Sequence, residues 1–333
     1  MFYRSLIFLT RIFGTWVFEL VAQGVAAGYF CFAPQRVRVG VRFYRALFPQ
    51  RSRLHALWCT WKQFRNFTSV YLDRFRLQEH GDIGHTSEGF EHIERALDAG
   101  SGGIVLMSHL GNWEVAAYIM QQKRPGIPLL LFMGKRAKDS IDRIQKGEIR
   151  DRGIRVVAVE KNEEAAFDLL EGLRFLQSGG IVSMTGDRVW SAEQRAVRVK
   201  MLGHEVALPE TPHLLAMLSG APLLIYFARR VGPRQYHFKC CPPLTVDKAS
   251  RRFREEAIRR SAQAYAELLE AELRANPFEW YHFEPFLQSV DKRRLGPLSE
   301  FRLPVCRLPR WPVLIPTGVR VHGQTSHRAQ RLG

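Results

Sequence analysis

Several features that mark common protein classes are absent from this sequence of 333 residues. Its 5 cysteines form no Cys-x-x-Cys pair and no zinc-ligand spacing, and an odd number without a framework indicates a reducing compartment. There is no phosphate-binding loop of the Gly-x-x-x-x-Gly-Lys type, no Gly-x-Gly-x-x-Gly after a strand, and no internal repeat. We therefore expect no nucleotide, no metal and no cofactor.

The sequence also lacks an uninterrupted apolar run long enough to cross a membrane. Residues 5–33 are mostly apolar, but Arg11 and Glu19 interrupt them. A spanning helix needs about 20 apolar residues, and a central charge costs roughly 2.5–3.5 kcal/mol. No small-x-small cleavage site follows before Pro34, which argues against a signal peptide. Residues 1–33 are therefore expected to form a membrane-associated helix, and both a span and a helix lying in the interface remain open.

Acidic residues are scarce at both ends of the chain. Residues 1–80 hold 12 Lys and Arg against 3 Asp and Glu, and residues 287–333 hold 9 against 2. The stretch between them is nearly neutral, although the whole chain carries +17. Basic ends suit an anionic membrane, a nucleic acid or an acidic protein. The apolar N-terminus favours the membrane, so we expect no nucleic-acid partner.

Four segments follow from composition and periodicity. After residues 1–33, residues 34–80 are basic and aromatic, with helices expected up to Pro49 and over 52–77. Residues 81–286 form the main domain. Residues 287–333 make a basic, proline-containing tail without sustained periodicity, which we expect to be poorly ordered.

The main domain alternates short apolar runs with amphipathic stretches. Strands are expected over 103–108, 128–133, 154–159, 180–186 and 222–230. Helices are expected over 88–99, 112–122, 138–151, 162–177, 210–219 and 251–275. Such alternation predicts the α/β class, with a central mixed sheet flanked by helices.

The string Ser-His-Leu-Gly-Asn-Trp-Glu over 108–114 stands where the first of these strands meets a helix. Acyl transfer to an alcohol requires a base, and imidazole serves because its pKa lies near working pH. Such a base needs an acceptor that fixes its tautomer. The sequence therefore proposes His109 as the base and Glu114 as the orienting carboxylate. The N–H groups of Gly111 and Asn112, at the helix N-terminus, are expected to receive the oxyanion.

This motif resembles that of the late acyltransferases of lipid A biosynthesis, within the lysophospholipid acyltransferase-like group. Their hallmark is His, four residues and an acid, often as His-(Leu/Phe)-Gly-Asn-Trp-Glu, and the resemblance covers roughly residues 5–286. It implies a fold like that of glycerol-phosphate acyltransferase and a location on the cytoplasmic face of a bacterial inner membrane. It also implies an acyl donor carried on acyl carrier protein, and a lipid or glycolipid acceptor.

The same resemblance suggests further substrate-binding residues. The family places an acid near the catalytic centre after a strand, which here points to Asp187, with Arg188 beside it. It also has an arginine between its second and third strands, and Arg150 and Arg152 compete for that place.

One departure bears on the acceptor. Lipid A enzymes usually have Trp followed by His-Arg-Arg-Phe-like residues, whereas residues 276–286 read NPFEWYHFEPF, with Glu284 and Pro285 in place of arginines. This is more similar to a sister branch of acyltransferases associated with other glycolipids. The main alternatives are acyl transfer to an amine and a non-catalytic basic protein that binds membranes or nucleic acid.

Overall fold

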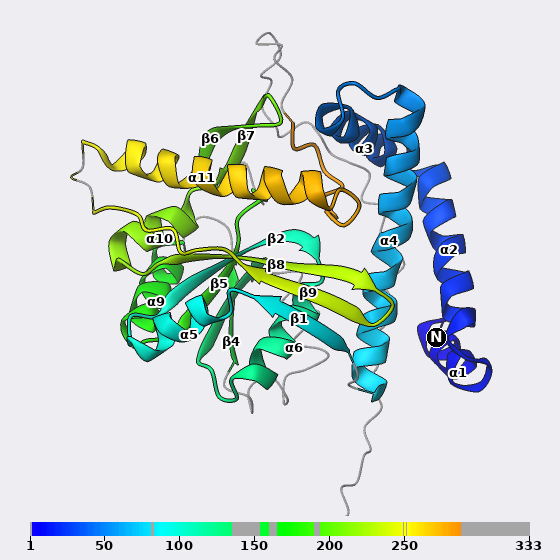
Figure 1. The fold of residues 1–333 in the computed structure, drawn as a ribbon, viewed down its shortest axis with the longest axis horizontal. Coiled ribbons are helices and arrows are strands. Elements are labelled where there is room, and N and C mark those ends of the chain that lie inside the picture. The colour runs from blue at the N-terminus through cyan, green and yellow to red at the C-terminus, as the bar shows by residue number, and fades with distance from the viewer. Residues whose placement is uncertain are drawn as a thin grey trace, which may run out of the picture.

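The computed structural model describes residues 2–80, 83–134, 154–159, 165–189, 194–248, 250 and 252–287. They form an α/β body with a group of N-terminal helices beside it (Figure 1). The expected α/β class is confirmed. The expected helix over 138–151 and the tail after residue 287 lie outside the described residues.

A seven-stranded sheet forms the centre of the body, in the order β1-β9-β8-β2-β5-β3-β4. The strands are β1 (Gly84–Glu88), β2 (Gly103–Gly111), β3 (Leu129–Gly134), β4 (Ile154–Val159), β5 (Ile181–Thr185), β8 (Leu223–Gly232) and β9 (Gln235–Cys240). All neighbours are parallel except β8 and β9, so the sheet is mixed, as expected. All five expected strands are present. β1 and β9 belong to the same sheet but were not expected from the sequence.

Helices cover both faces of the sheet. On one face, Ile104, Leu106 and Leu110 of β2 share a core with α9 (Ala165–Gln177), α10 (Thr211–Ser219) and α11 (Arg254–Ala275). On the other face, Val105 and Met107 share a core with α5 (Glu91–Asp98) and α6 (Trp113–Lys123). β2 is thus covered on both sides, which explains its unbroken apolar run.

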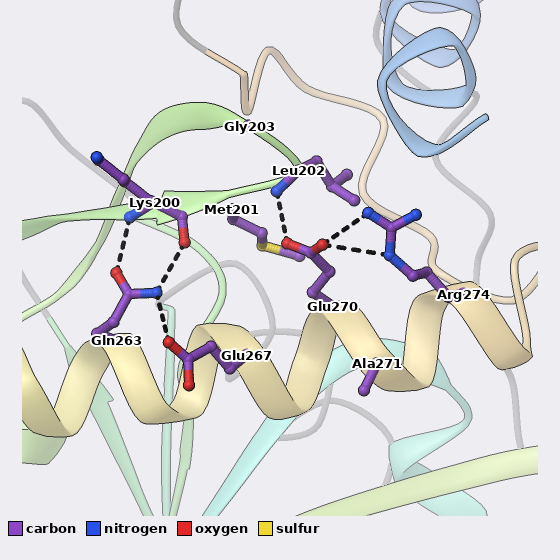
Figure 2. A pocket seen from close by; sticks show the side chains of 9 residues that line it. All are labelled: Lys200, Met201, Leu202, Gly203, Gln263, Glu267, Glu270, Ala271 and Arg274. Carbon is purple, nitrogen blue, oxygen red and sulfur yellow. Dashed lines mark hydrogen bonds and ion pairs between the residues drawn. The ribbon is translucent and has the colours of Figure 1, made fainter. Parts of the chain in front are cut away.

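A two-stranded hairpin of β6 (Ala196–Met201) and β7 (His204–Pro209) packs on α11. Between them lies a groove of about 330 Å³ (Figure 2). Gln263 of α11 pairs with both the N–H and the carbonyl of Lys200, and Glu270 accepts from the N–H of Leu202 at 2.6 Å. These contacts dock the hairpin on the helix.

The N-terminal helices are α1 (Phe2–Phe13), α2 (Thr15–Phe32), α3 (Pro34–Leu47) and α4 (Arg53–His80). The single helix expected over residues 1–33 is wrong: Gly14, at φ 95°, separates two helices, a backbone conformation that glycine adopts without steric cost. By length and composition alone, α2 could cross a membrane, and little of it is buried. α2 and α3 both pack along α4.

The N-terminal helices are tied to the segment that follows α11. The Tyr44 hydroxyl of α3 donates to the carbonyl of Pro277 at 2.8 Å. The Gln63 side chain of α4 donates to the carbonyl of Trp280. These bonds hold residues 277–280 against the N-terminal helices, and a β-bridge between Leu110 and Trp280 places the same segment next to the end of β2.

Candidate active site

The sheet brings two strand ends together. β2 and β5 pair in parallel, so their carboxyl ends lie at the same edge, and His109 near the end of β2 meets Asp187 just after β5. Gly186, between β5 and Asp187, donates its N–H to the carbonyl of Met107 at 2.8 Å. This bond continues the pairing of the two strands up to the site.

His109 and Asp187 are joined by two hydrogen bonds. The backbone N–H of His109 donates to Oδ2 of Asp187 at 2.8 Å, and Nδ1 of His109 lies 2.8 Å from Oδ1. The indole N–H of Trp280 donates to Oδ2 at 2.7 Å. Asp187 is fully buried, whereas 22% of the His109 side chain is exposed. The imidazole is therefore the member of the pair that solvent or substrate can reach.

The charge state of Asp187 decides the tautomer of His109. Burial by itself raises the pKa of the carboxyl, but His109, with smaller contributions from His282 and Trp280, holds that pKa well below its usual range. An ionised carboxylate only accepts hydrogen bonds, so Nδ1 of His109 carries the proton and donates. In the neutral ring the lone pair is then on Nε2. This is the arrangement of a general base held by a carboxylate.

Residues 279–282 line the other side of the strand end. Tyr281 donates its N–H to the carbonyl of His109 at 2.8 Å, and Gly111 donates to the carbonyl of Glu279 at 2.9 Å. The ring of His282 lies 5.9 Å from that of His109 and stacks on Trp280. Burial lowers the pKa of His282 to about 4, so this second imidazole is neutral at neutral pH.

Gly111 and Asn112 form the turn into α6. Gly111 has φ 76°, and a Cβ there would lie 1.5 Å from the carbonyl oxygen of Ala228, so only glycine fits. Asn112 caps α6 by accepting from the N–H groups of Glu114 and Val115, at 3.1 and 3.5 Å.

The oxyanion role expected for the N–H groups of Gly111 and Asn112 does not fit this geometry. The first donates to Glu279 and the second to Ala228, at 2.9 and 3.3 Å. Both donors are therefore already used within the protein. The two residues shape the turn that follows His109.

The other predicted residues fall in different places. Glu114 is half-buried in the first turn of α6, and its role as the orienting carboxylate stays a prediction. Arg188, next to Asp187, forms an ion pair with Glu284. Arg150 and Arg152 lie outside the described residues. Among the described residues no cluster of three or more His, Cys, Asp or Glu could hold a metal ion.

Sequence reasoning missed Trp280 and His282 as neighbours of His109. Both belong to the 276–286 string, which drew attention only through its missing arginines. The sequence did contain a signal for them. It was an indole and an imidazole two residues apart, in a segment without secondary-structure periodicity.

The family model for bacterial lipid A biosynthesis acyltransferases matches residues 54–289 of this chain. The chain belongs to that family. The matched range includes His109, Glu114, Asp187 and Trp280, and begins within the first residues of α4. The resemblance read from the His109 motif is confirmed.

This chain is similar to curated proteins from mycobacteria. Phosphatidylinositol mannoside acyltransferase of Mycobacterium tuberculosis H37Rv is 24% identical over 198 residues, which are 59% of this chain and 58% of that protein. The protein of the same name from Mycolicibacterium smegmatis is 22% identical over 224 residues, covering 66% of this chain and 69% of that relative. The match thus spans less than two thirds of the M. tuberculosis enzyme.

Proposed function

We propose that this protein transfers a fatty acyl group from a thioester to a hydroxyl of a glycolipid. The observation that carries the proposal is the His109–Asp187 pair at the strand end, in which Nδ1 of a partly exposed imidazole lies 2.8 Å from a buried carboxylate oxygen. Membership of the lipid A acyltransferase family supports the reaction class. The relatives are named for an acceptor that is a mannosylated phospholipid, which supports a glycolipid as acceptor.

In the proposed reaction, Nε2 of His109 removes the proton of the acceptor hydroxyl as its oxygen attacks the thioester carbonyl carbon. The tetrahedral intermediate then collapses, the carbon–sulfur bond breaks, and the imidazolium returns its proton to the leaving thiolate. Asp187 stabilises the imidazolium between these two transfers. Glu114 is proposed as a second carboxylate that assists the orientation of His109, on the strength of the sequence motif.

The donor is proposed to be acyl carrier protein, an acidic partner that the basic chain would attract. The acceptor hydroxyl belongs to a lipid A-like or other glycolipid. An amine acceptor would need the same base, because it must also lose a proton once it has attacked.

The proposed location is the cytoplasmic face of the bacterial inner membrane, with α1 and α2 in the interface. Large apolar side chains on these helices are exposed, among them Phe13 and Trp16. Glu19 of α2 pairs with Arg76 of α4 at 3.4 Å, and α2 packs along α4. A spanning α2 would have to break these contacts, so they favour a helix that lies flat.

The test is a purified transfer assay with an acyl thioester and a glycolipid acceptor, in which mass spectrometry measures the added acyl group. His109→Ala should lower turnover by at least about 10³-fold, because the base is lost. Circular dichroism and the melting temperature establish that the variant is folded. If a folded His109→Ala protein turns over at the wild-type rate, the proposed mechanism is wrong.

A further inference from the structure

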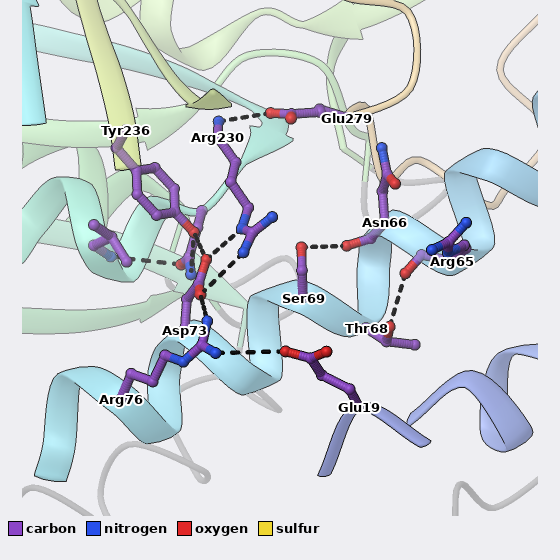
Figure 3. Close-up of polar contacts among 12 residues, drawn as sticks. Glu19, Arg65, Asn66, Thr68, Ser69, Asp73, Arg76, Arg230, Tyr236 and Glu279 are labelled. Carbon is purple, nitrogen blue, oxygen red and sulfur yellow. Dashed lines mark hydrogen bonds and ion pairs between the residues drawn. The ribbon is translucent and has the colours of Figure 1, made fainter. Parts of the chain in front are cut away.

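A buried carboxylate outside the candidate site is connected to it from two directions. Asp73, in α4, has no exposed surface. Its Oδ2 accepts from Nε of Arg230 at 2.6 Å and from the hydroxyl of Tyr236 at 2.8 Å. Arg230 lies near the end of β8, where it pairs with Tyr236 of β9. Figure 3 shows these side chains converging on Asp73.

The first connection leads to the turn after His109. The Tyr236 hydroxyl, which donates to Asp73, is 3.5 Å from the side-chain nitrogen of Asn112. Asn112 caps α6 with its side-chain oxygen, so its amide group is held from both ends. Through Tyr236, Asp73 therefore fixes the rotamer of the residue that follows Gly111.

The second connection leads to the segment that contains Trp280. Arg230, held by Asp73 through its guanidinium, donates its backbone N–H to Oε2 of Glu279 at 2.8 Å. The carbonyl of Glu279 accepts from Gly111, and the next residue, Trp280, donates to Asp187. Asp73 thus supports both chain segments that enclose His109.

We propose that Asp73 is a positioning residue, which holds the Gly111–Asn112 turn and the Glu279–Trp280 segment in register so that His109 stays aligned with Asp187. The proposal rests on the proposed function for its kinetic consequence. Asp73 itself touches none of the reacting groups. It acts through Tyr236 on one side and through Arg230 on the other.

The kinetic test uses Asp73→Asn, Tyr236→Phe and the double variant, with Tyr226→Phe as the matched control. Tyr226 is a buried tyrosine of β8 whose ring stacks on Phe238, outside the contacts of Asp73. We expect kcat to fall about 10- to 100-fold in Asp73→Asn, since small misplacements cost this much. In Tyr236→Phe it should fall about fivefold, the factor for one hydrogen bond. KM for the acyl thioester should stay unchanged in both.

The double variant separates positioning from general destabilisation. At a temperature where circular dichroism shows all variants folded, its kcat should equal that of Asp73→Asn, because replacing Asp73 already removes the anchor of the Tyr236 hydroxyl. Tyr226→Phe should leave kcat within twofold of wild type. If Tyr236→Phe keeps wild-type kcat, or if the two effects on kcat multiply, the proposal is overturned. If Asp73→Asn does not fold, the comparison of kcat between Tyr236→Phe and Tyr226→Phe decides by itself.

A second measurement does not depend on activity. Hydrogen–deuterium exchange of a peptide over residues 107–116 should be faster in Tyr236→Phe than in wild type, and unchanged in Tyr226→Phe. If wild type shows no acyl transfer, the proposed function fails, and this exchange measurement still decides whether Asp73 holds the turn. Equal exchange in wild type and Tyr236→Phe would overturn the positioning role by itself.

Discussion

The two oxygens of Asp187 accept three hydrogen bonds, two from His109 and one from Trp280. This satisfies much of the acceptor capacity of a buried carboxylate, which would otherwise be costly to desolvate. Glu114 is placed differently, in the first turn of α6 beside the Asn112 cap. The two acids can therefore be distinguished by substitution.

We predict that Asp187→Asn lowers kcat by about 10³- to 10⁴-fold, because an amide no longer enforces the Nδ1–H tautomer of His109. Glu114→Gln should have a smaller effect, of about 10- to 100-fold, as expected for an assisting group. The purified transfer assay compares the two variants, with melting temperatures as the check on folding. The reverse ranking would assign the orienting role to Glu114 instead.

At the scale of secondary-structure elements, α1 and α2 carry large aromatic side chains that are exposed on the surface of the described chain. Phe13 and Trp16 are 58% and 60% exposed. Burying one such side chain in an apolar phase contributes about 1.5–3 kcal/mol. We predict that replacing both with Ser weakens binding to anionic phospholipid vesicles at least about tenfold, measured by co-sedimentation.

The control for this loss of binding is Phe253→Ser, which removes an aromatic ring of similar exposure just before α11. It should bind vesicles as wild type does. If the double variant also binds as wild type, α1 and α2 are not the membrane contact.

The elements also show what sequence patterns reveal and what they do not. β2, β3, β5 and β8 were predictable because each contains a mostly apolar run that is buried on both faces. β1 reads GHTSE, mostly polar and exposed, and only its pairing with β9 makes it a strand. β9 alternates buried Tyr236, Phe238 and Cys240 with less buried residues, a signal that was present but overlooked.

The candidate site was predictable only in part, for a topological reason. His109 stood out because its motif is local. Asp187 is 78 residues away, and its contact with His109 requires β5 to lie next to β2. Along the chain β3 and β4 come between β2 and β5, so the order of strands in the sequence does not predict that β2 and β5 are neighbours in the sheet. Only the resemblance to a family suggested Asp187.

At the scale of the whole molecule, buried ionisable groups determine how stability depends on pH. Burial lowers the pKa of His213 to about 4, from about 6.5 in an unfolded chain. Between these values the unfolded state binds a proton that the folded state does not, so stability falls as pH decreases. His282 acts in the same direction. Glu279 acts in the opposite one, because burial raises its pKa to about 7.

We predict that His213→Gln flattens this pH dependence. Wild type should lose about 2 kcal/mol through His213 between pH 7 and pH 5, and the variant should not, although it is less stable at pH 7. Urea unfolding at the two pH values measures the change in the free energy of unfolding of each protein. His282 and Glu279 contribute equally to wild type and variant, so their contributions cancel when the two changes are compared. His85→Gln, at an exposed position, is the control and should keep the wild-type dependence. An unchanged dependence in His213→Gln would contradict the prediction.

The bond from Gln63 to Trp280 joins residues 217 positions apart, and it has a consequence for the order of events during synthesis. A ribosome adds about 5–20 residues per second, so roughly 10–45 seconds separate the two residues. α1 and α2 precede the Trp280 segment in the chain, so with the membrane contact proposed for them they would reach the lipid before that segment has been made. With the membrane location proposed above, the nascent chain would meet its surface before Trp280 can donate to Asp187, and the site would be completed there.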